Sequence, residues 1–218
     1  MVEKLRLDKS TMLLYLVTDR TWLGENKLEN QVEQCVKAGA TFVQLREKDL
    51  DFDHFVDEGL KIKEITDRYQ VPFVINDNIE VALAVNADGV HVGQSDMNAK
   101  DVRSLLGPDK ILGVSARTVE QALLAQSQGA DYIGVGAVFS TTTKNDADDV
   151  SFEEVKAICE AVTIPVVAIG GINEHNILQL KGCGVDGVAV ISAILAKPDI
   201  EKATKELREL SSQMIKQG

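Results

Sequence analysis

The stretch Ala38–Val43 (AGATFV) is a short unit that recurs along the chain. It combines a small residue or glycine, a polar turn residue and the start of an apolar strand. Similar runs occupy residues 128–133 and 183–188, and a shorter version occupies residues 86–90. Each run follows a segment with a helical spacing of apolar residues, so the same helix-to-strand turn is repeated. This repetition predicts an α/β chain in which helices alternate with parallel strands.

Extending this pattern along the whole chain gives eight strands of nearly continuous apolar character, which is typical of a parallel sheet covered by helices. Eight strands close a (β/α)8 TIM barrel, so we predict one domain over residues 1–218. Within it, residues 1–12 form an N-terminal extension and residues 137–150 an active-site loop. An open doubly wound sheet is the structural alternative. The strands are predicted around residues 13–17, 42–45, 73–75, 89–92, 111–114, 132–135, 166–169 and 185–190. The helices are predicted around residues 28–38, 51–69, 79–85, 102–106, 119–128, 152–162, 177–181 and 199–216.

The composition restricts the class of protein. With 218 residues, of which 44% are hydrophobic, the chain can bury a large core. Its formal charge of −11 argues against a nucleic-acid partner, which needs a broad basic face. Cys35, Cys159 and Cys183 form no C-x-x-C pair, so we expect neither a disulfide framework nor a zinc site. No apolar run approaches the ~20 residues of a membrane span, and residues 1–12 lack a signal-peptide core. We expect a cytoplasmic protein without a membrane partner, and a homo-oligomer stays open.

The second strand ends in charge, in the sequence FVQLREK of residues 42–48. Because side chains alternate along a strand, Gln44, Arg46 and Lys48 share one face. Two cations and an amide that point the same way at the end of a buried strand are costly unless an anion meets them. The pattern therefore predicts an anion-binding site at this strand end.

Other polar residues also follow the predicted strands, whereas the strand starts show no comparable set of charged and polar residues. In a barrel of this kind the active site lies at the carboxyl ends of the strands, so these residues should gather at one mouth. The set comprises residues 18–20, 46–48, 76–77, 94, 96, 115, 141–144, 170–171 and 191–192.

Asp77 and Asp96 follow the adjacent third and fourth strands. Two carboxylates close together repel unless a cation or a proton lies between them, and carboxylate oxygens suit Mg²⁺. The alternative is that both residues are helix N-caps.

Three further features bear on a phosphate site. Gly170 and Gly171 allow a close backbone approach to a phosphate, with the next helix N-terminus aimed at it, and Ile191-Ser192 would add further N–H groups. The alternative is a tight turn and nothing more. The loop of residues 140–146 carries hydroxyls and an ammonium that suit phosphate oxygens.

His91 could be a general base or a metal ligand, but a hydrogen-bonded core histidine is the favoured interpretation.

With these residues in view, the chain resembles the thiamine phosphate synthase family. The likeness runs from residues 15–19 to residues 191–194. Its motifs are VQLREK at 43–48, IND at 75–77, DGVHVGQSD at 88–96, T-x-T-K at 141–144 and IGGI at 169–172. The resemblance implies a transferase of thiamine biosynthesis with a TIM-barrel fold. It would join hydroxymethylpyrimidine diphosphate to the nitrogen of thiazole phosphate with one Mg²⁺ ion, by a dissociative, carbocation-like mechanism that gives thiamine phosphate and diphosphate.

The same resemblance implies roles for individual residues. The catalytic residues would be Arg46, Lys48, Ser115 and Lys144, which with Asn76 also bind the diphosphate. The metal ligands would be Asp77 and Asp96, and Gln44 would contact the pyrimidine. The thiazole phosphate pocket would comprise Thr141, Thr143, Gly171, Ile191 and Ser192. The family loop usually reads P-T-x-T-K-K-D, and Ser140 and Asn145 depart from it, which implies a looser loop.

Three rival functions stay open. Thiazole tautomerase shares the fold but lacks much of the diphosphate apparatus, and the intact cations and carboxylates argue against it. A sugar-phosphate epimerase or an indole-pathway isomerase needs acid/base pairs at the strand ends, whereas this polar set is cationic and metal-binding. The third rival is a regulatory barrel that binds thiazole phosphate without turnover.

Overall fold

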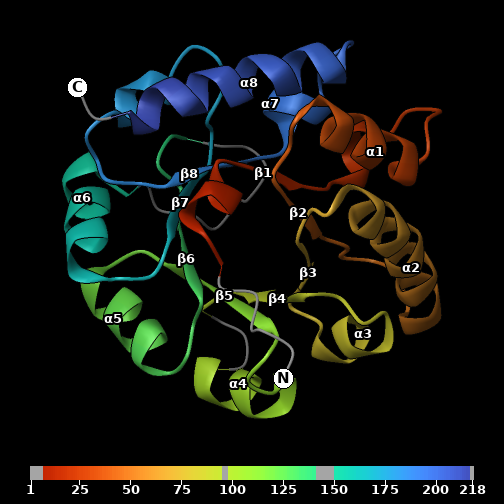
Figure 1. Cartoon of the computed structure of the whole chain (residues 1–218), viewed down its shortest axis with the longest axis horizontal. Coiled ribbons are helices and arrows are strands. Elements are labelled where there is room, and N and C mark those ends of the chain that lie inside the picture. Colours follow the sequence, from red (N-terminus) through yellow and green to blue (C-terminus); the bar gives the residue numbers. More distant parts are fainter. Residues whose placement is uncertain (1–6, 95–97, 141–149, 217–218) are drawn as a thin grey trace.

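The computed structural model describes residues 7–94, 98–140 and 150–216. Eight parallel strands pair in sequence order, and β8 pairs with β1, so the sheet closes into a barrel. Figure 1 shows the barrel at the centre and the helices arranged around it. The predicted single-domain TIM barrel is therefore confirmed, and the open doubly wound sheet is wrong. The strands are β1 Leu14–Val17, β2 Phe42–Leu45, β3 Phe73–Asn76, β4 Gly89–Val92, β5 Ile111–Ala116, β6 Tyr132–Val135, β7 Val166–Ile169 and β8 Gly187–Val190.

The helices begin and end close to the predicted positions. The α-helices are α1 Leu28–Ala38, α2 Phe52–Tyr69, α3 Ile79–Ala84, α4 Ala99–Leu106, α5 Val119–Ser127, α6 Phe152–Ala161, α7 Ser192–Leu195 and α8 Ile200–Ile215. Short 3-10 helices are η1 Lys9–Met12, η2 Arg20–Trp22 and η3 Ile177–Leu180. One prediction differs in kind, because residues 177–181 were expected to be part of a helix and form only the four-residue η3. Gly182 and Gly184 follow with positive φ values, a conformation that ends a helix.

The core has two layers, because alternate residues of each strand point to opposite sides of the sheet. In β2, Phe42 points into the barrel and Val43 points outward against the helices. The residues of the inner layer are Met12, Tyr15, Val17, Phe42, Val74, Ile111, Tyr132, Val167 and Ala189.

The recurring unit of the sequence has a structural role at the end of the barrel where the strands begin. Thr41 immediately precedes β2. Its N–H donates to the carbonyl of Leu14 at 2.8 Å, and its Oγ1 accepts the N–H of Leu14 at 2.9 Å. The same two-way pair recurs three times, between Asp88 and Phe73, between Asp131 and Leu112, and between Asp186 and Val166. We call Thr41, Asp88, Asp131 and Asp186 the base clamps, since each ties an even-numbered strand to the strand before it.

Replacing Asp88 with alanine is expected to lower the free energy of unfolding by about 1–3 kcal/mol, because the backbone N–H of Phe73 loses its side-chain acceptor. Phe73 is fully buried, so water cannot easily replace that acceptor. Asp88→Asn keeps a side-chain oxygen and should lose much less. Urea denaturation of the two variants checks this. Equal stabilities for Asp88→Ala and Asp88→Asn would contradict the role given to the clamp.

Candidate active site

The barrel brings the predicted cationic strand end beside a predicted metal ligand. Arg46 directly follows β2, and Asp77 directly follows β3. These strands are parallel neighbours, with Leu45 opposite Ile75 in the register. Since the carboxyl ends of parallel strands meet at one edge, Arg46 and Asp77 lie on the same rim. The rim also receives Ser115 of β5 and the segments that follow β7 and β8. Of the predicted site residues, Asp96, Thr141, Thr143 and Lys144 lie outside the described residues.

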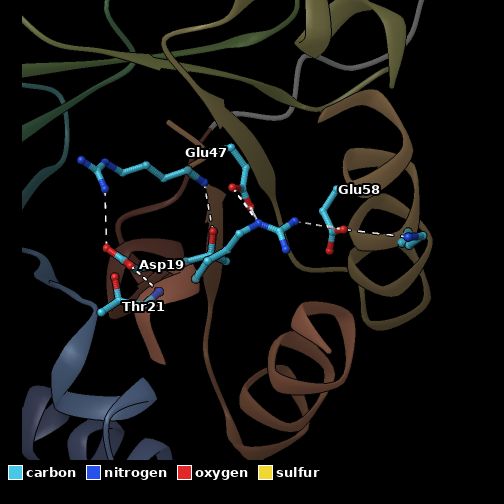
Figure 2. A network of polar contacts seen from close by, with 8 residues as sticks. Asp19, Thr21, Glu47 and Glu58 are labelled. Carbon is cyan, nitrogen blue, oxygen red and sulfur yellow. Dashed lines mark hydrogen bonds and ion pairs between the residues drawn. The ribbon is translucent and has the colours of Figure 1, made fainter. Parts of the chain in front are cut away.

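Arg46 is held against the end of β1. Its Nη1 lies 3.7 Å from Oδ2 of Asp19, and its side chain is only 10% exposed. Its backbone N–H donates to Oγ1 of Thr18 at 3.0 Å. Asp19 in turn accepts the N–H of Thr21 at 2.9 Å, as Figure 2 shows. The guanidinium is thus positioned before any ligand binds.

A second ion-pair network lies directly beside Arg46. The Nε of Arg20 lies 2.8 and 2.9 Å from the two carboxylate oxygens of Glu47, and its Nη2 lies 3.2 Å from Oε2 of Glu58 on α2 (Figure 2). Burial raises the pKa of Glu47, although the hydrogen bond from Arg20 opposes that shift. Because Glu47 lies between Arg46 and Lys48 in the chain, this network fixes the loop that carries both predicted diphosphate ligands.

A pocket of about 360 Å³ lies beside these networks and is lined by residues 19–22 and 46–50. Arg46 and Lys48 both line it, and Lys48 is exposed. Arg46 and Glu47 have different partners, since Arg46 pairs with Asp19 and Glu47 pairs with Arg20, which also reaches Glu58 on α2. The lining contains three cations, Arg20, Arg46 and Lys48, and three carboxylates, Asp19, Glu47 and Asp49. Arg20 and Arg46 are paired with carboxylates of this lining, and a polyanion would have to compete with those carboxylates.

Replacing Arg20 with alanine should leave Glu47 and Glu58 close together without their shared cation. Since Arg20 is partly exposed, the expected loss is about 1–2 kcal/mol of unfolding free energy near neutral pH. The pKa of Glu47 is raised in the folded protein, so the folded state is favoured when Glu47 is protonated. This contribution of Glu47 to stability is present at low pH and is lost as the pH rises through its folded pKa.

The defect of Arg20→Ala should therefore shrink between about pH 7 and about pH 5 in denaturation experiments. Adding Glu47→Gln to Arg20→Ala should recover part of the loss. A defect of Arg20→Ala that is independent of pH would count against the like-charge explanation.

The two predicted polar contacts inside the mouth, Gln44 and Ser115, both bond to other side chains. Nε2 of Gln44 donates to the hydroxyl of Tyr15 at 2.6 Å. Oγ of Ser115 lies 2.9 Å from Nε2 of His91, whose Nδ1 lies 2.9 Å from the hydroxyl of Tyr132. His91 is thus a hydrogen-bonded histidine of the barrel interior, as favoured from the sequence. Tyr15 and Tyr132 were missed, because the sequence marks them only as apolar strand residues.

The backbone of Asp77 is in the left-handed conformation, and Asp77 does not cap a helix. Its φ is +62°, its N–H donates to the carbonyl of His91 at 2.8 Å, and Nδ2 of Asn76 donates to its Oδ2 at 2.5 Å. The N-cap alternative is wrong for Asp77, because Asn78 caps α3. Asn98 caps α4, and Asp96 lies outside the described residues. Within the described ranges, no three His, Cys, Asp or Glu side chains group as a metal centre. The carboxylate of Asp77 remains a suitable oxygen donor for a magnesium ion that also takes phosphate and water oxygens.

The glycines after β7 adopt left-handed conformations, with φ values of +102° for Gly170 and +64° for Gly171. A Cβ on Gly171 would lie 2.6 Å from the carbonyl oxygen of Ser140, so close packing against the loop after β6 requires glycine there. The helix N-terminus expected to follow these glycines is absent from residues 171–176. The side chains of Asn173 and Asn176 instead donate to the carbonyl of Gly171 at 3.1 and 2.9 Å.

After β8, Ile191 is the N-cap of the four-residue α7, which begins at Ser192. Its carbonyl accepts the N–H groups of Ile194 and Leu195. Residues 191–192 thus lie at the same rim as Gly171, because β7 and β8 are neighbours. Across the described ranges, we find no helix of the length and apolar character needed to cross a membrane.

Comparison with known proteins identifies the family of the chain. The family model described as thiamine monophosphate synthase matches residues 14–194. A thiamine-phosphate synthase of Clostridium tetani is 54% identical over 194 residues, which cover 89% of this chain and 93% of the relative. One of Methanobrevibacter smithii is 52% identical over 194 residues, covering 89% and 92%. The solved thiamine phosphate pyrophosphorylase of Pyrococcus furiosus superposes with a TM-score of 0.88 at 38% identity, over 95% of this chain and 99% of that one. The chain therefore belongs to the thiamine monophosphate synthase family and is a transferase of thiamine biosynthesis.

Proposed function

We propose that this chain transfers the hydroxymethylpyrimidine group from its diphosphate to the nitrogen of thiazole phosphate, giving thiamine phosphate and diphosphate. The observation that carries the proposal is the guanidinium of Arg46, which is only slightly exposed and is held by Asp19 on the rim that also bears Asp77. The adjoining pocket, which Lys48 also lines, would take the diphosphate. Because the net charge of the barrel is −11, a polyanion has to be held by individual cations such as Arg46 and Lys48.

The first step in this proposal is breakage of the bond between the pyrimidine methylene carbon and the diphosphate oxygen. The electron pair of that bond leaves with the diphosphate, whose growing negative charge is stabilised by Arg46, Lys48 and Lys144. The carbon becomes a cation to which the ring amino group donates electron density. Ser115 and Asn76 would hold oxygens of the departing group.

In the second step the thiazole nitrogen donates its lone pair to the carbon cation and forms the new C–N bond. No enzyme nucleophile and no added oxidant are required, so the chain acts by positioning, by charge neutralisation and by keeping water from the cation. The phosphate of the thiazole would be bound by Thr141, Thr143, Gly171, Ile191 and Ser192. Positive φ values at Gly170 and Gly171 and the proximity of β7 to β8 support a backbone surface for that phosphate.

Asp77 and Asp96 would hold one Mg²⁺ ion, and the oxygen chemistry of Asp77 fits that ion. When bound, Mg²⁺ acts as a Lewis acid toward diphosphate oxygens. The amide of Asn76 donates to Oδ2 of Asp77 and would orient the carboxylate.

The proposal is tested by incubating the protein with both substrates and Mg²⁺ and measuring diphosphate release together with thiamine phosphate. Release that depends on both substrates is expected. A thiazole tautomerase would convert its thiazole substrate without releasing diphosphate. Binding of thiazole phosphate without turnover would favour a regulatory barrel, and either result would overturn the proposal. A cytoplasmic location, expected from the sequence, would suit these phosphorylated substrates.

A further inference from the structure

Five polar side chains form a continuous hydrogen-bonded chain across the inside of the barrel. Nε2 of Gln44 lies 2.6 Å from the hydroxyl of Tyr15, which lies 2.7 Å from the hydroxyl of Tyr132. That hydroxyl lies 2.9 Å from Nδ1 of His91, and Nε2 of the same ring lies 2.9 Å from Oγ of Ser115. The residues come from β2, β1, β6, β4 and β5, so the chain spans the interior from one side to the other. We call these five residues the interior chain.

Each hydroxyl of the interior chain has a single hydrogen, and this fixes which residue donates and which accepts in each hydrogen bond. The amide of Gln44 donates to Tyr15, so the single hydroxyl hydrogen of Tyr15 is directed to Tyr132. In that arrangement the hydroxyl hydrogen of Tyr132 is directed to Nδ1 of His91, which accepts it and carries no proton of its own. A neutral imidazole with a bare Nδ1 carries its proton on Nε2, which donates to Oγ of Ser115.

Neighbouring glycines make room for these rings. A Cβ on Gly113 would lie 2.1 Å from Cζ of Tyr132, and a Cβ on Gly134 would lie 3.1 Å from Cε1 of His91. Gly113 is opposite His91 in the register of β4 and β5. Gly134 is opposite Ser115 in the register of β5 and β6. The strands around the interior chain therefore leave the space that its aromatic rings need.

Burial keeps the two phenols neutral. Tyr15 and Tyr132 are almost fully buried, and burial raises the pKa of both hydroxyls above their ordinary value. Their rings also pack against Phe42, at centroid distances of 4.5 Å for Tyr15 and 5.6 Å for Tyr132. Each hydroxyl thus retains the one hydrogen that the direction of the interior chain requires.

We propose that Tyr15, Tyr132 and His91 are positioning residues that fix what Gln44 and Ser115 present to the pyrimidine diphosphate, an inference that rests on the proposed function. At one end, Gln44 donates one amide hydrogen to Tyr15, which fixes the orientation of the amide and presents its carbonyl oxygen as an acceptor for an amino group. At the other end, Oγ of Ser115 already accepts from His91, so its hydrogen is directed to an anionic oxygen. The interior chain would thereby select an aminopyrimidine over a pyrimidine with an oxo group at the same position.

The first test is the tautomer of His91 in the protein without substrates. The chain has three histidines, so nitrogen NMR of protein labelled with ¹⁵N-histidine resolves each ring. We expect His91 to be protonated at Nε2 alone. Tyr132→Phe removes the donor to Nδ1 and should give a mixture of tautomers. A His91 protonated at Nδ1 or at both nitrogens in the native protein, or a tautomer unchanged in Tyr132→Phe, would overturn the proposal.

The second test is kinetic. Tyr132→Phe and Tyr15→Phe should each raise KM for the pyrimidine diphosphate about tenfold, with KM for thiazole phosphate unchanged. Tyr69→Phe is the matched control, because it removes a hydroxyl that bonds Glu33 on the outside of the barrel, and it should change neither KM. If Tyr132→Phe does not fold, Tyr15→Phe carries the test. A purely structural role predicts equal changes in both KM values and would exclude the proposal. The tautomer measurement needs no turnover, so failure of the proposed function would be recognised separately.

Discussion

Replacing Arg46 with alanine is expected to lower the rate of diphosphate release about 10²–10³-fold while the barrel stays folded. The side chain of Arg46 is 10% exposed and lies at the rim pocket, where charge on the departing diphosphate would develop. Lys48→Ala should have an effect of the same kind, because Lys48 lines the same pocket. Steady-state diphosphate release, with circular dichroism as a check on folding, measures both variants.

Arg68→Ala is the control for this prediction. Arg68 is an exposed cation of α2 that pairs with Glu33 and Glu64 on the outside of the barrel. Its removal changes the net charge by the same amount as Arg46→Ala but leaves the rim intact. Turnover close to that of the native protein in either Arg46→Ala or Lys48→Ala would remove the diphosphate assignment.

Replacing Asp77 with asparagine is expected to lower turnover about a hundredfold at low Mg²⁺ concentration, because one charged metal ligand is lost. Asparagine suits this position, since it tolerates the positive φ of +62° better than alanine does. High Mg²⁺ should restore part of the activity. Calorimetric titration of Mg²⁺ in the presence of diphosphate should show weaker binding in Asp77→Asn than in the native protein.

Asp88→Asn is the matched control for the metal prediction, because it makes the same chemical change at the opposite end of the barrel. It should leave the dependence of turnover on Mg²⁺ as in the native protein. Identical Mg²⁺ titrations for Asp77→Asn and the native protein would exclude Asp77 as a ligand.

The fold could be predicted closely because its main determinants are local. Buried parallel strands are short and apolar throughout. The residues that end the helices between them, such as Gly39 after α1, have conformational preferences that the sequence displays. The segment between β7 and β8 is the exception. Its length and apolar spacing indicated more helix, but Asn173 and Asn176 bond to the carbonyl of Gly171 and hold the chain in turns. Side-chain bonds of this kind compete with helix formation and leave no periodic pattern.

The candidate site could be predicted only in part. Arg46 and Asp77 were assigned to one rim because strand order alone brings them together. The interior chain could not be predicted, because its bond between Tyr15 and Tyr132 joins residues 117 positions apart, and only the register and tilt of a closed barrel bring them together. The Arg20 network was missed for a similar reason, since its partner Glu58 lies on a helix whose rotation the sequence does not specify.

The base clamps have a consequence for how such an enzyme can change. They join the strands at the end remote from the proposed catalytic rim, through contacts that involve none of the residues proposed to bind substrate. Substitutions in the rim loops therefore leave these four contacts between neighbouring strands in place. The clamps thus hold the strand starts together through contacts separate from those of the rim, where the Arg20 network makes its own contribution to stability.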